Sequence, residues 1–142
     1  MRARRENMNR SQHAAVACPA GARKVLIVDD EAPVRESLRR YLKDVGYVVM
    51  EAADFDHALS ALGAICVDAV VLDVRLPGRS GIELLQHLRS DAKLAALPVL
   101  ILTGYFPDAA EQALLEQLGA SVFYKPQGCV TVLRHLERMM LR

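Results

Sequence analysis

Four apolar runs of the sequence end in polar residues whose side chains could do chemistry together. In chain order these polar residues are Asp29 with Asp30, Asp73, Thr103 and Lys125. Carboxylates that lie close together raise one another's pKa, and a hard divalent cation such as Mg²⁺ removes that penalty. An ammonium and a hydroxyl beside one carboxylate would favour transfer of a phosphoryl group onto it, because both stabilise the phosphoryl oxygens. The residue types therefore indicate phosphoryl chemistry, with Asp73 as the acceptor.

Each of these residues also has an ordinary structural explanation. Asp73 could simply begin the turn that contains Pro77 and Gly78, and an acidic pair before a helix favours the helix dipole. A threonine at a strand end and a Lys-Pro pair at a turn are common. All five residues fall at the ends of four strands, and one shared site explains this coincidence better than five separate causes do. We therefore favour a single site.

The rest of the chain alternates between strand-like and helix-like segments. Short continuous apolar runs predict buried parallel strands at residues 24–28, 47–50, 68–73, 98–102 and 121–124. Apolar residues at helical spacing predict helices at residues 33–45, 54–63, 80–88, 107–118 and 129–140. This alternation predicts an α/β fold with a parallel sheet and helices on both faces. Because the carboxyl ends of parallel strands share one edge, the polar side chains should converge there.

Residues at the expected helix ends support this assignment. Pro33 suits the first turn of a helix, and Gly46 and Gly119 suit helix stops. Ser80 followed by Glu83 predicts a capping box, in which each side chain accepts a hydrogen bond from the other residue's backbone amide.

Positive charge is concentrated at the beginning of the chain. Residues 1–24 hold six Lys or Arg and one acid, a net charge of +5, whereas residues 25–142 carry a net charge of −4. Residues 1–22 lack a sustained periodicity and end in breaker residues. We therefore expect a disordered basic arm, followed by one domain over residues 23–142. The arm could alternatively contact nucleic acid or an acidic partner.

The sequence does not favour a membrane. No run approaches the roughly 18 apolar residues of a spanning helix. The first 20 residues contain four arginines but lack the long apolar segment of a signal peptide. We therefore expect a cytoplasmic protein.

The motifs resemble those of the receiver domain of bacterial two-component response regulators. The matching segments are residues 25–31, 71–81, 100–104 and the pair Lys125-Pro126. Motif order and spacing agree over residues 24–140. The resemblance implies a flavodoxin-like, doubly wound five-stranded sheet with strand order 2-1-3-4-5.

The same resemblance implies a role for each site residue. Asp73 would accept a phosphoryl group from a histidine kinase or a histidine phosphotransfer protein. Mg²⁺ would be held by Asp29, Asp30, Asp73 and the backbone carbonyl of Arg75. Lys125 would pair with the phosphoryl group, Thr103 would offer a hydroxyl donor, and the Lys125–Pro126 peptide bond would be cis.

We expect a phosphorylation-controlled binding module that signals through a downstream protein target. It should lack enzymatic activity apart from Mg²⁺-dependent self-phosphorylation and slow autodephosphorylation. One alternative is a phosphohydrolase that forms an aspartyl-phosphate on Asp73, but such hydrolases place an acid two residues later, where Arg75 stands. Another is a phosphorylation-independent scaffold, against which the complete set of site residues argues.

The end of the chain bears on its partners. Nothing follows residue 142 in this sequence, so we expect no DNA-binding output domain in it. Two interpretations stay open, namely a stand-alone receiver and a piece of a longer protein. The last helix carries more apolar residues than one stripe requires. These residues are Val130, Val132, Leu133, Leu136, Met139 and Met140. We expect some to be exposed and to mark an interaction face, which a homodimer could use; the alternative is complete burial.

The segment before Lys125 departs from the family. Receivers usually couple the threonine of the fourth strand to an aromatic residue three positions before the lysine, which is Val122 here. Counting four positions from the glycine after the fourth helix gives Phe123 instead, so this segment is one residue short. A one-residue slip turns every strand side chain to the other face, so we expect the lysine end to hold the register. Val122 would then occupy the switch position and Phe123 the core, and coupling to Thr103 would be absent or pass to Tyr124, on the face of Val122.

Overall fold

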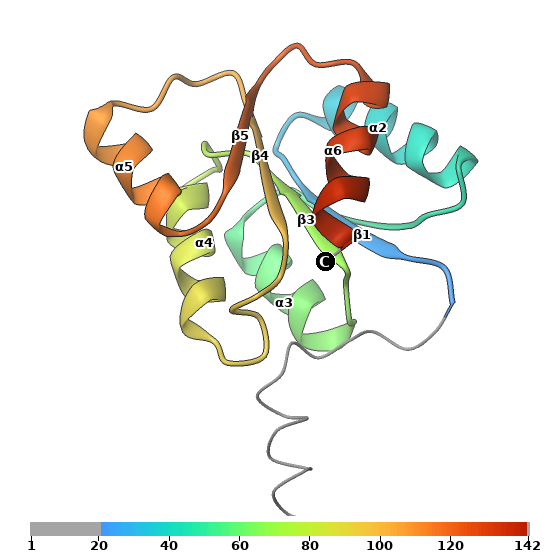
Figure 1. Cartoon of the computed structure of the whole chain (residues 1–142), viewed down its shortest axis with the longest axis horizontal. Helices are drawn as coiled ribbons and strands as arrows, with labels where there is room; N and C mark the ends of the chain where they lie inside the picture. Colours follow the sequence, from blue (N-terminus) through green and yellow to red (C-terminus); the bar gives the residue numbers. More distant parts are fainter. Residues whose placement is uncertain (1–20, 142) are drawn as a thin grey trace, which may run out of the picture.

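Five parallel strands form one sheet in the computed structural model, which describes residues 21–141. The strands are β1 (Lys24–Val28), β2 (Val48–Ala52), β3 (Ala69–Leu72), β4 (Val99–Thr103) and β5 (Ser121–Tyr124). Their order in the sheet is β2-β1-β3-β4-β5 (Figure 1), which confirms the predicted doubly wound topology. The predicted arm at residues 1–22 lies, except for its last two residues, outside the described part of the chain.

Within residues 21–141, four helices connect successive strands and a fifth follows the last strand, and together they cover both faces of the sheet. The helices are α2 (Ala32–Asp44), α3 (Phe55–Ala64), α4 (Gly81–Ser90), α5 (Ala109–Gln117) and α6 (Cys129–Met140). Helices α2 and α6 pack on one face, and α3, α4 and α5 pack on the other (Figure 1). None of these helices is both long enough and apolar enough to pass through a membrane.

Alternate residues of the central strands point to the two faces of the sheet. Val25 and Ile27 of β1 join the core under α2 and α6, whereas Leu26 and Val28 join the core under α3, α4 and α5. Strands β1, β3 and β4 are almost entirely buried, because they lie between other strands and between two layers of helices. This burial explains their continuous apolar runs, and it brings the polar residues that end or follow them to one edge.

The second strand extends further than predicted. We expected it at residues 47–50, but its last two residues also pair with the last two residues of β1. Glu51 interrupts the apolar run and so conceals this extension in the sequence. Its carboxylate forms ion pairs with Arg35 at 3.6 Å and Arg39 at 3.4 Å, both on α2. A contact between a helix and a strand therefore stabilises a polar residue inside the strand.

The predicted capping box at the start of α4 is wrong. Ser80 caps this helix by accepting a hydrogen bond from a backbone amide of the first turn. The Glu83 carboxylate instead pairs with Arg79 Nε at 3.0 Å, because a charged partner lies one turn away. The reciprocal box forms on α5, where Asp108 accepts from the Glu111 amide at 2.8 Å and Glu111 accepts from the Asp108 amide at 3.0 Å.

Helix α6 buries one apolar stripe and leaves one further apolar side chain exposed. Val132 and Leu136 are buried, whereas Val130 is 48% exposed. The prediction that some of the six apolar residues of this helix are exposed is confirmed for Val130 alone. Its use as an interaction face stays a prediction.

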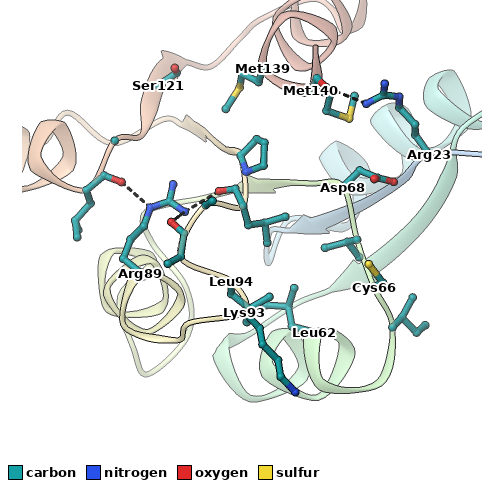
Figure 2. A pocket seen from close by; sticks show the side chains of 18 of the residues that line it. Arg23, Leu62, Cys66, Asp68, Arg89, Lys93, Leu94, Ser121, Met139 and Met140 are labelled. Atoms are coloured by element: carbon teal, nitrogen blue, oxygen red, sulfur yellow. Dashed lines mark hydrogen bonds between the residues drawn. The ribbon is translucent and has the colours of Figure 1, made fainter. Parts of the chain in front are cut away.

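Arg89, near the end of α4, ties together the opposite, amino edge of the sheet. Its Nε donates to the Leu118 carbonyl at 2.7 Å, and its Nη1 donates to the carbonyls of Ala95 at 3.2 Å and Leu97 at 2.7 Å (Figure 2). These carbonyls belong to the segments that lead into β4 and β5. One guanidinium therefore holds the entry to both strands.

Candidate functional site

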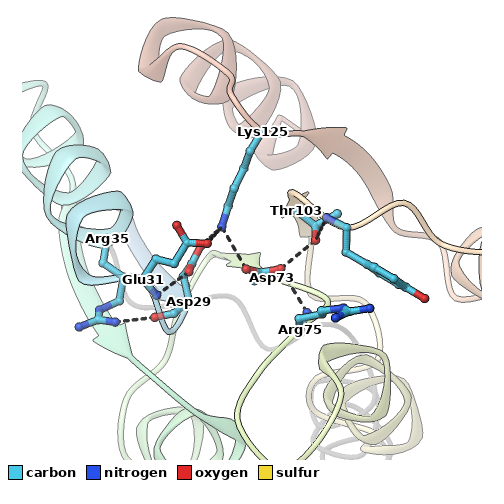
Figure 3. Close-up of polar contacts among 8 residues, drawn as sticks. Asp29, Glu31, Arg35, Asp73, Arg75, Thr103 and Lys125 are labelled. Atoms are coloured by element: carbon cyan, nitrogen blue, oxygen red, sulfur yellow. Dashed lines mark hydrogen bonds and ion pairs between the residues drawn. The ribbon is translucent and has the colours of Figure 1, made fainter.

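Asp73 directly follows β3 and is 5% exposed. Its Oδ1 accepts hydrogen bonds from Thr103 Oγ1 at 2.8 Å and from the Arg75 amide at 3.2 Å (Figure 3). Its Oδ2 lies 3.0 Å from Lys125 Nζ. Both carboxylate oxygens are therefore held in place at the carboxyl edge of the sheet, as the strand ends predicted.

Lys125 bridges three carboxylates. Its Nζ lies 2.9 Å from Asp29 Oδ2, 3.0 Å from Asp73 Oδ2 and 3.3 Å from Glu31 Oε1. Burial works to lower the pKa of Lys125, but its hydrogen bonds to Asp29 and Asp73 outweigh burial and raise this pKa above the ordinary value. The ammonium therefore stays charged and balances the carboxylates. The peptide bond between Lys125 and Pro126 is cis, as the resemblance implied.

Asp29, which directly follows β1, is 3% exposed. Burial raises the pKa of Asp29, and the hydrogen bonds from Lys125 and from the Glu31 amide, at 2.9 Å, offset only part of this effect. An ionised Asp29 therefore lowers the stability of the fold. Such a group is typical of functional sites.

Four carboxylates gather at this edge. Oxygens of Asp29, Asp30, Glu31 and Asp73 all lie within 4.8 Å of one another. Hard cations such as Mg²⁺ prefer oxygen ligands and usually keep several waters. The two buried acids provide a fixed side, and the exposed Asp30 and Glu31 leave the other side open to solvent. This donor set fits the predicted Mg²⁺ site and places Glu31 beside it. That the backbone carbonyl of Arg75 also binds the ion stays a prediction.

Residues 25–136 match the family model of the response regulator receiver domain. The chain belongs to this family. The chemotaxis protein CheY-3 of Vibrio cholerae is 35% identical over 123 residues, which cover 84% of this chain and 92% of that protein. The phosphate regulon transcriptional regulatory protein PhoB of Escherichia coli (strain K12) is 40% identical over 82 residues, or 58% of this chain. The matched part is 36% of the length of PhoB.

Solved receiver structures share the fold. The chemotaxis response regulator CheY4 of Vibrio cholerae superposes with a TM-score of 0.76 at 31% identity, covering 84% of this chain and 99% of that chain. A putative response regulator from Chloroflexus aurantiacus superposes with a TM-score of 0.78 at 32% identity, covering 86% and 100% of the two chains. The flavodoxin-like fold that the motifs implied is confirmed.

Thr103 connects the site of this receiver to the start of α5. Its hydroxyl donates to Asp73 and accepts a hydrogen bond from the Tyr105 amide at 3.1 Å. The Tyr105 ring centroid lies 4.0 Å from the Arg75 guanidinium carbon, and the Tyr105 hydroxyl donates to Glu111 at 2.9 Å. A pocket of about 400 Å³ lies beside these last three residues. The acceptor, the loop after β4 and the cap of α5 are thus connected by successive contacts.

Side chains of β5 alternate between the two cores of the receiver. Phe123 packs in the core under α2 and α6, and Val122 packs against the opposite core. Tyr124 pairs in register with Thr103, and its ring stacks on Phe106, with centroids 4.7 Å apart. Phe106 is 73% exposed. Tyr124 is therefore the aromatic residue paired with the end of β4. Which residue responds to phosphorylation stays a prediction.

Three residues support the site but were not predicted as site residues from the sequence. Glu31 adds a carboxylate, and its position as a third acid in the 29–31 run was a usable signal. Arg35 Nη1 donates to the Asp29 carbonyl at 2.6 Å and pairs with Glu51, so it holds the acidic turn against β2. Gly81 lies against the Asp73 backbone. The last two contacts span six and eight residues, across the turns that follow β1 and β3, and no periodicity of the sequence predicts them.

Proposed function

We propose that Asp73 accepts a phosphoryl group from a phosphohistidine of a histidine kinase or a histidine phosphotransfer protein. The observation that carries this proposal is the way both oxygens of Asp73 are held. Lys125 contacts one oxygen at 3.0 Å, and the Thr103 hydroxyl contacts the other at 2.8 Å. A carboxylate that is held in a fixed orientation next to a cation is suited to nucleophilic attack on phosphorus.

In the proposed step, a carboxylate oxygen of Asp73 attacks phosphorus while the phosphorus–nitrogen bond to the histidine breaks. The imidazole leaves with the bonding electron pair, and an acyl phosphate forms. Asp73 then no longer carries the charge that Lys125 balanced, so the ammonium pairs with a phosphoryl oxygen instead. The Thr103 hydroxyl, which donates to Asp73 Oδ1 before the transfer, can donate to another phosphoryl oxygen afterwards.

Mg²⁺ would be held by the carboxylates of Asp29, Asp30 and Asp73 and by the backbone carbonyl of Arg75. When bound, the ion supplies positive charge to the phosphoryl oxygens as the transfer proceeds. Asp29 is fixed for this task by its contacts with Lys125 and the Glu31 amide. Asp30 makes no such contact within the described residues and is free to turn toward a cation.

The phosphorylated domain would then bind a downstream protein target in the cytoplasm. Beyond Mg²⁺-dependent self-phosphorylation from small phosphodonors and slow autodephosphorylation, we propose no catalytic activity. A homodimer through the exposed part of α6 around Val130 is one form that this binding could take.

Acetyl phosphate with Mg²⁺ tests the acceptor assignment. We expect the intact mass to rise by one phosphoryl group, with a label that is stable to acid and labile to base. Asp73→Asn should abolish the label, and the exposed control Asp56→Asn, on α3, should keep it. Undiminished labelling of Asp73→Asn would refute the assignment, and peptide mapping of the wild-type label would identify the true acceptor.

A further inference from the structure

A second, separate surface feature lies at the amino edge of the sheet, opposite the acidic site. It is an open groove of about 1270 Å³ (Figure 2). Residues that lead into four of the strands line it, among them Arg23, Asp68, Pro98 and Ser121. The ends of α3, α4 and α6 complete its walls. The groove is therefore built by the fold itself, on the edge away from Asp73.

Large apolar side chains form much of this groove. Met139 and Met140 of α6 lie on one side, and Leu62 of α3 and Leu94 lie on the other (Figure 2). Leu97 also contributes. Apolar surface on both walls favours a ligand that itself carries large apolar side chains.

The groove also carries excess positive charge. Four cations line it, namely Arg23, Arg89, Lys93 and Arg138, against a single acid, Asp68. No ion pair formed by residues 21–141 involves any of these four cations. The Asp68 carboxylate accepts a hydrogen bond from the Lys24 amide at 2.7 Å. The charge of the groove is therefore not compensated by the described part of the chain.

The positive charge of the Arg89 guanidinium is fixed in position. Three backbone carbonyls hold its guanidinium in place, and burial lowers the pKa of Arg89. Carbonyls satisfy hydrogen bonds but bring no full negative charge. A cation held half-buried without a carboxylate is stabilised by an anion that enters the groove.

We propose that this groove binds an extended segment of a partner protein that carries both acidic and large apolar side chains. Successive side chains of an extended strand point to opposite sides, so such a segment can contact both walls of the groove. Nucleic acid is the weaker match, because no Phe, Tyr or Trp lines the groove to stack bases. The basic segment that enters the described fold at Gly21 carries the same charge sign as the groove, so it does not neutralise it.

Fluorescence anisotropy with the full chain tests this proposal at low ionic strength. The probe is a short fluorescein-labelled peptide in which glutamates alternate with leucines. The double variant Lys93→Glu/Arg138→Glu changes two exposed groove residues and should weaken binding about tenfold or more. The control Arg40→Glu/Arg134→Glu makes the same charge change at exposed positions of α2 and α6 outside the groove, and should bind within about twofold of wild type.

Other probes separate the remaining explanations. A lysine–leucine peptide should not bind, and a glutamate–serine peptide should bind more weakly because it lacks apolar side chains. Equal loss in both double variants would overturn the proposal, since net charge alone would then explain binding. So would absence of wild-type binding. Preferential binding of a single-stranded oligonucleotide that the groove variant loses would assign the groove to nucleic acid instead.

Discussion

Gly81 lies so close to the backbone carbonyl oxygen of Asp73 that a Cβ atom at position 81 would collide with it. The Gly81 amide also donates to the Val74 carbonyl at 2.6 Å. The first residue of α4 thus packs directly on the backbone of the proposed acceptor. The collision is with backbone rather than with the end of a flexible side chain, so either α4 or Asp73 must move if a side chain is introduced.

Gly81→Ala should therefore damage both the fold and the site. We expect it to lower the free energy of unfolding by about 1–3 kcal/mol, as overpacking does, and to slow phosphorylation by acetyl phosphate at least about tenfold. The matched control is Gly63→Ala on α3, where an added Cβ meets no atom within 4 Å. In this control the free energy of unfolding should rise by about 0.5–1 kcal/mol, and phosphorylation should stay at the wild-type rate. Urea unfolding and mass spectrometry measure the two effects, and wild-type behaviour of Gly81→Ala would contradict the packing argument.

Replacing Asp29 with asparagine should stabilise the unphosphorylated chain in metal-free buffer. Burial raises the pKa of Asp29 above its unfolded value, so the folded state favours the protonated form, and ionisation at higher pH lowers the free energy of unfolding. At neutral pH the free energy of unfolding of the variant should exceed that of wild type by ~0.5–2 kcal/mol, the range of single stabilising substitutions. The gain should vanish as the pH falls below the ordinary carboxyl pKa of about 3.9. The same variant should lose Mg²⁺-dependent phosphorylation, and a variant less stable than wild type at neutral pH would refute the prediction.

Mg²⁺ binding should depend on Asp30 more than on Glu31. Glu31 already contacts Lys125 at 3.3 Å, whereas Asp30 is exposed and has no ion pair among the described residues. We expect Asp30→Asn to weaken Mg²⁺ binding at least about tenfold and Glu31→Gln about threefold or less. An NMR titration follows the amides near Asp73 and Arg75 in each variant. Lack of any perturbation in wild type at millimolar Mg²⁺ would count against the metal site.

Tyr124 and Phe123 should respond differently to substitution and to phosphorylation. Phe123 packs in the core, so Phe123→Ala should lower the free energy of unfolding by ~3 kcal/mol. Tyr124 lies in register with Thr103 and stacks on the exposed Phe106, so phosphorylation should shift its ring resonance. Fluorine NMR of labelled rings separates the two. A large shift of Phe123 with an unchanged Tyr124 would restore the family's usual coupling.

Local signals were sufficient wherever burial alone shapes the sequence. Strands β1, β3 and β4 are covered on both faces, so each must be continuously apolar, and the residue that ends such a run must lie at the sheet edge. The ends of these apolar runs therefore identify Asp29, Asp73 and Thr103 from the sequence alone. The end of β2, an edge strand, was missed, because edge strands tolerate polar residues such as Glu51 and therefore lack a continuous apolar run.

Tertiary structure decided which of several possible contacts form around the site and the helix ends. Glu83 pairs with Arg79 rather than completing a capping box, Arg35 reaches the Asp29 carbonyl, and Gly81 packs on Asp73. Each outcome depends on which charged or backbone group the fold brings near. The groove at the amino edge is a similar case, because its walls come from helix ends and strand entries spread over the whole domain. The order of apolar and polar residues determines which segments are buried, but only the packing of those segments determines which side chains meet.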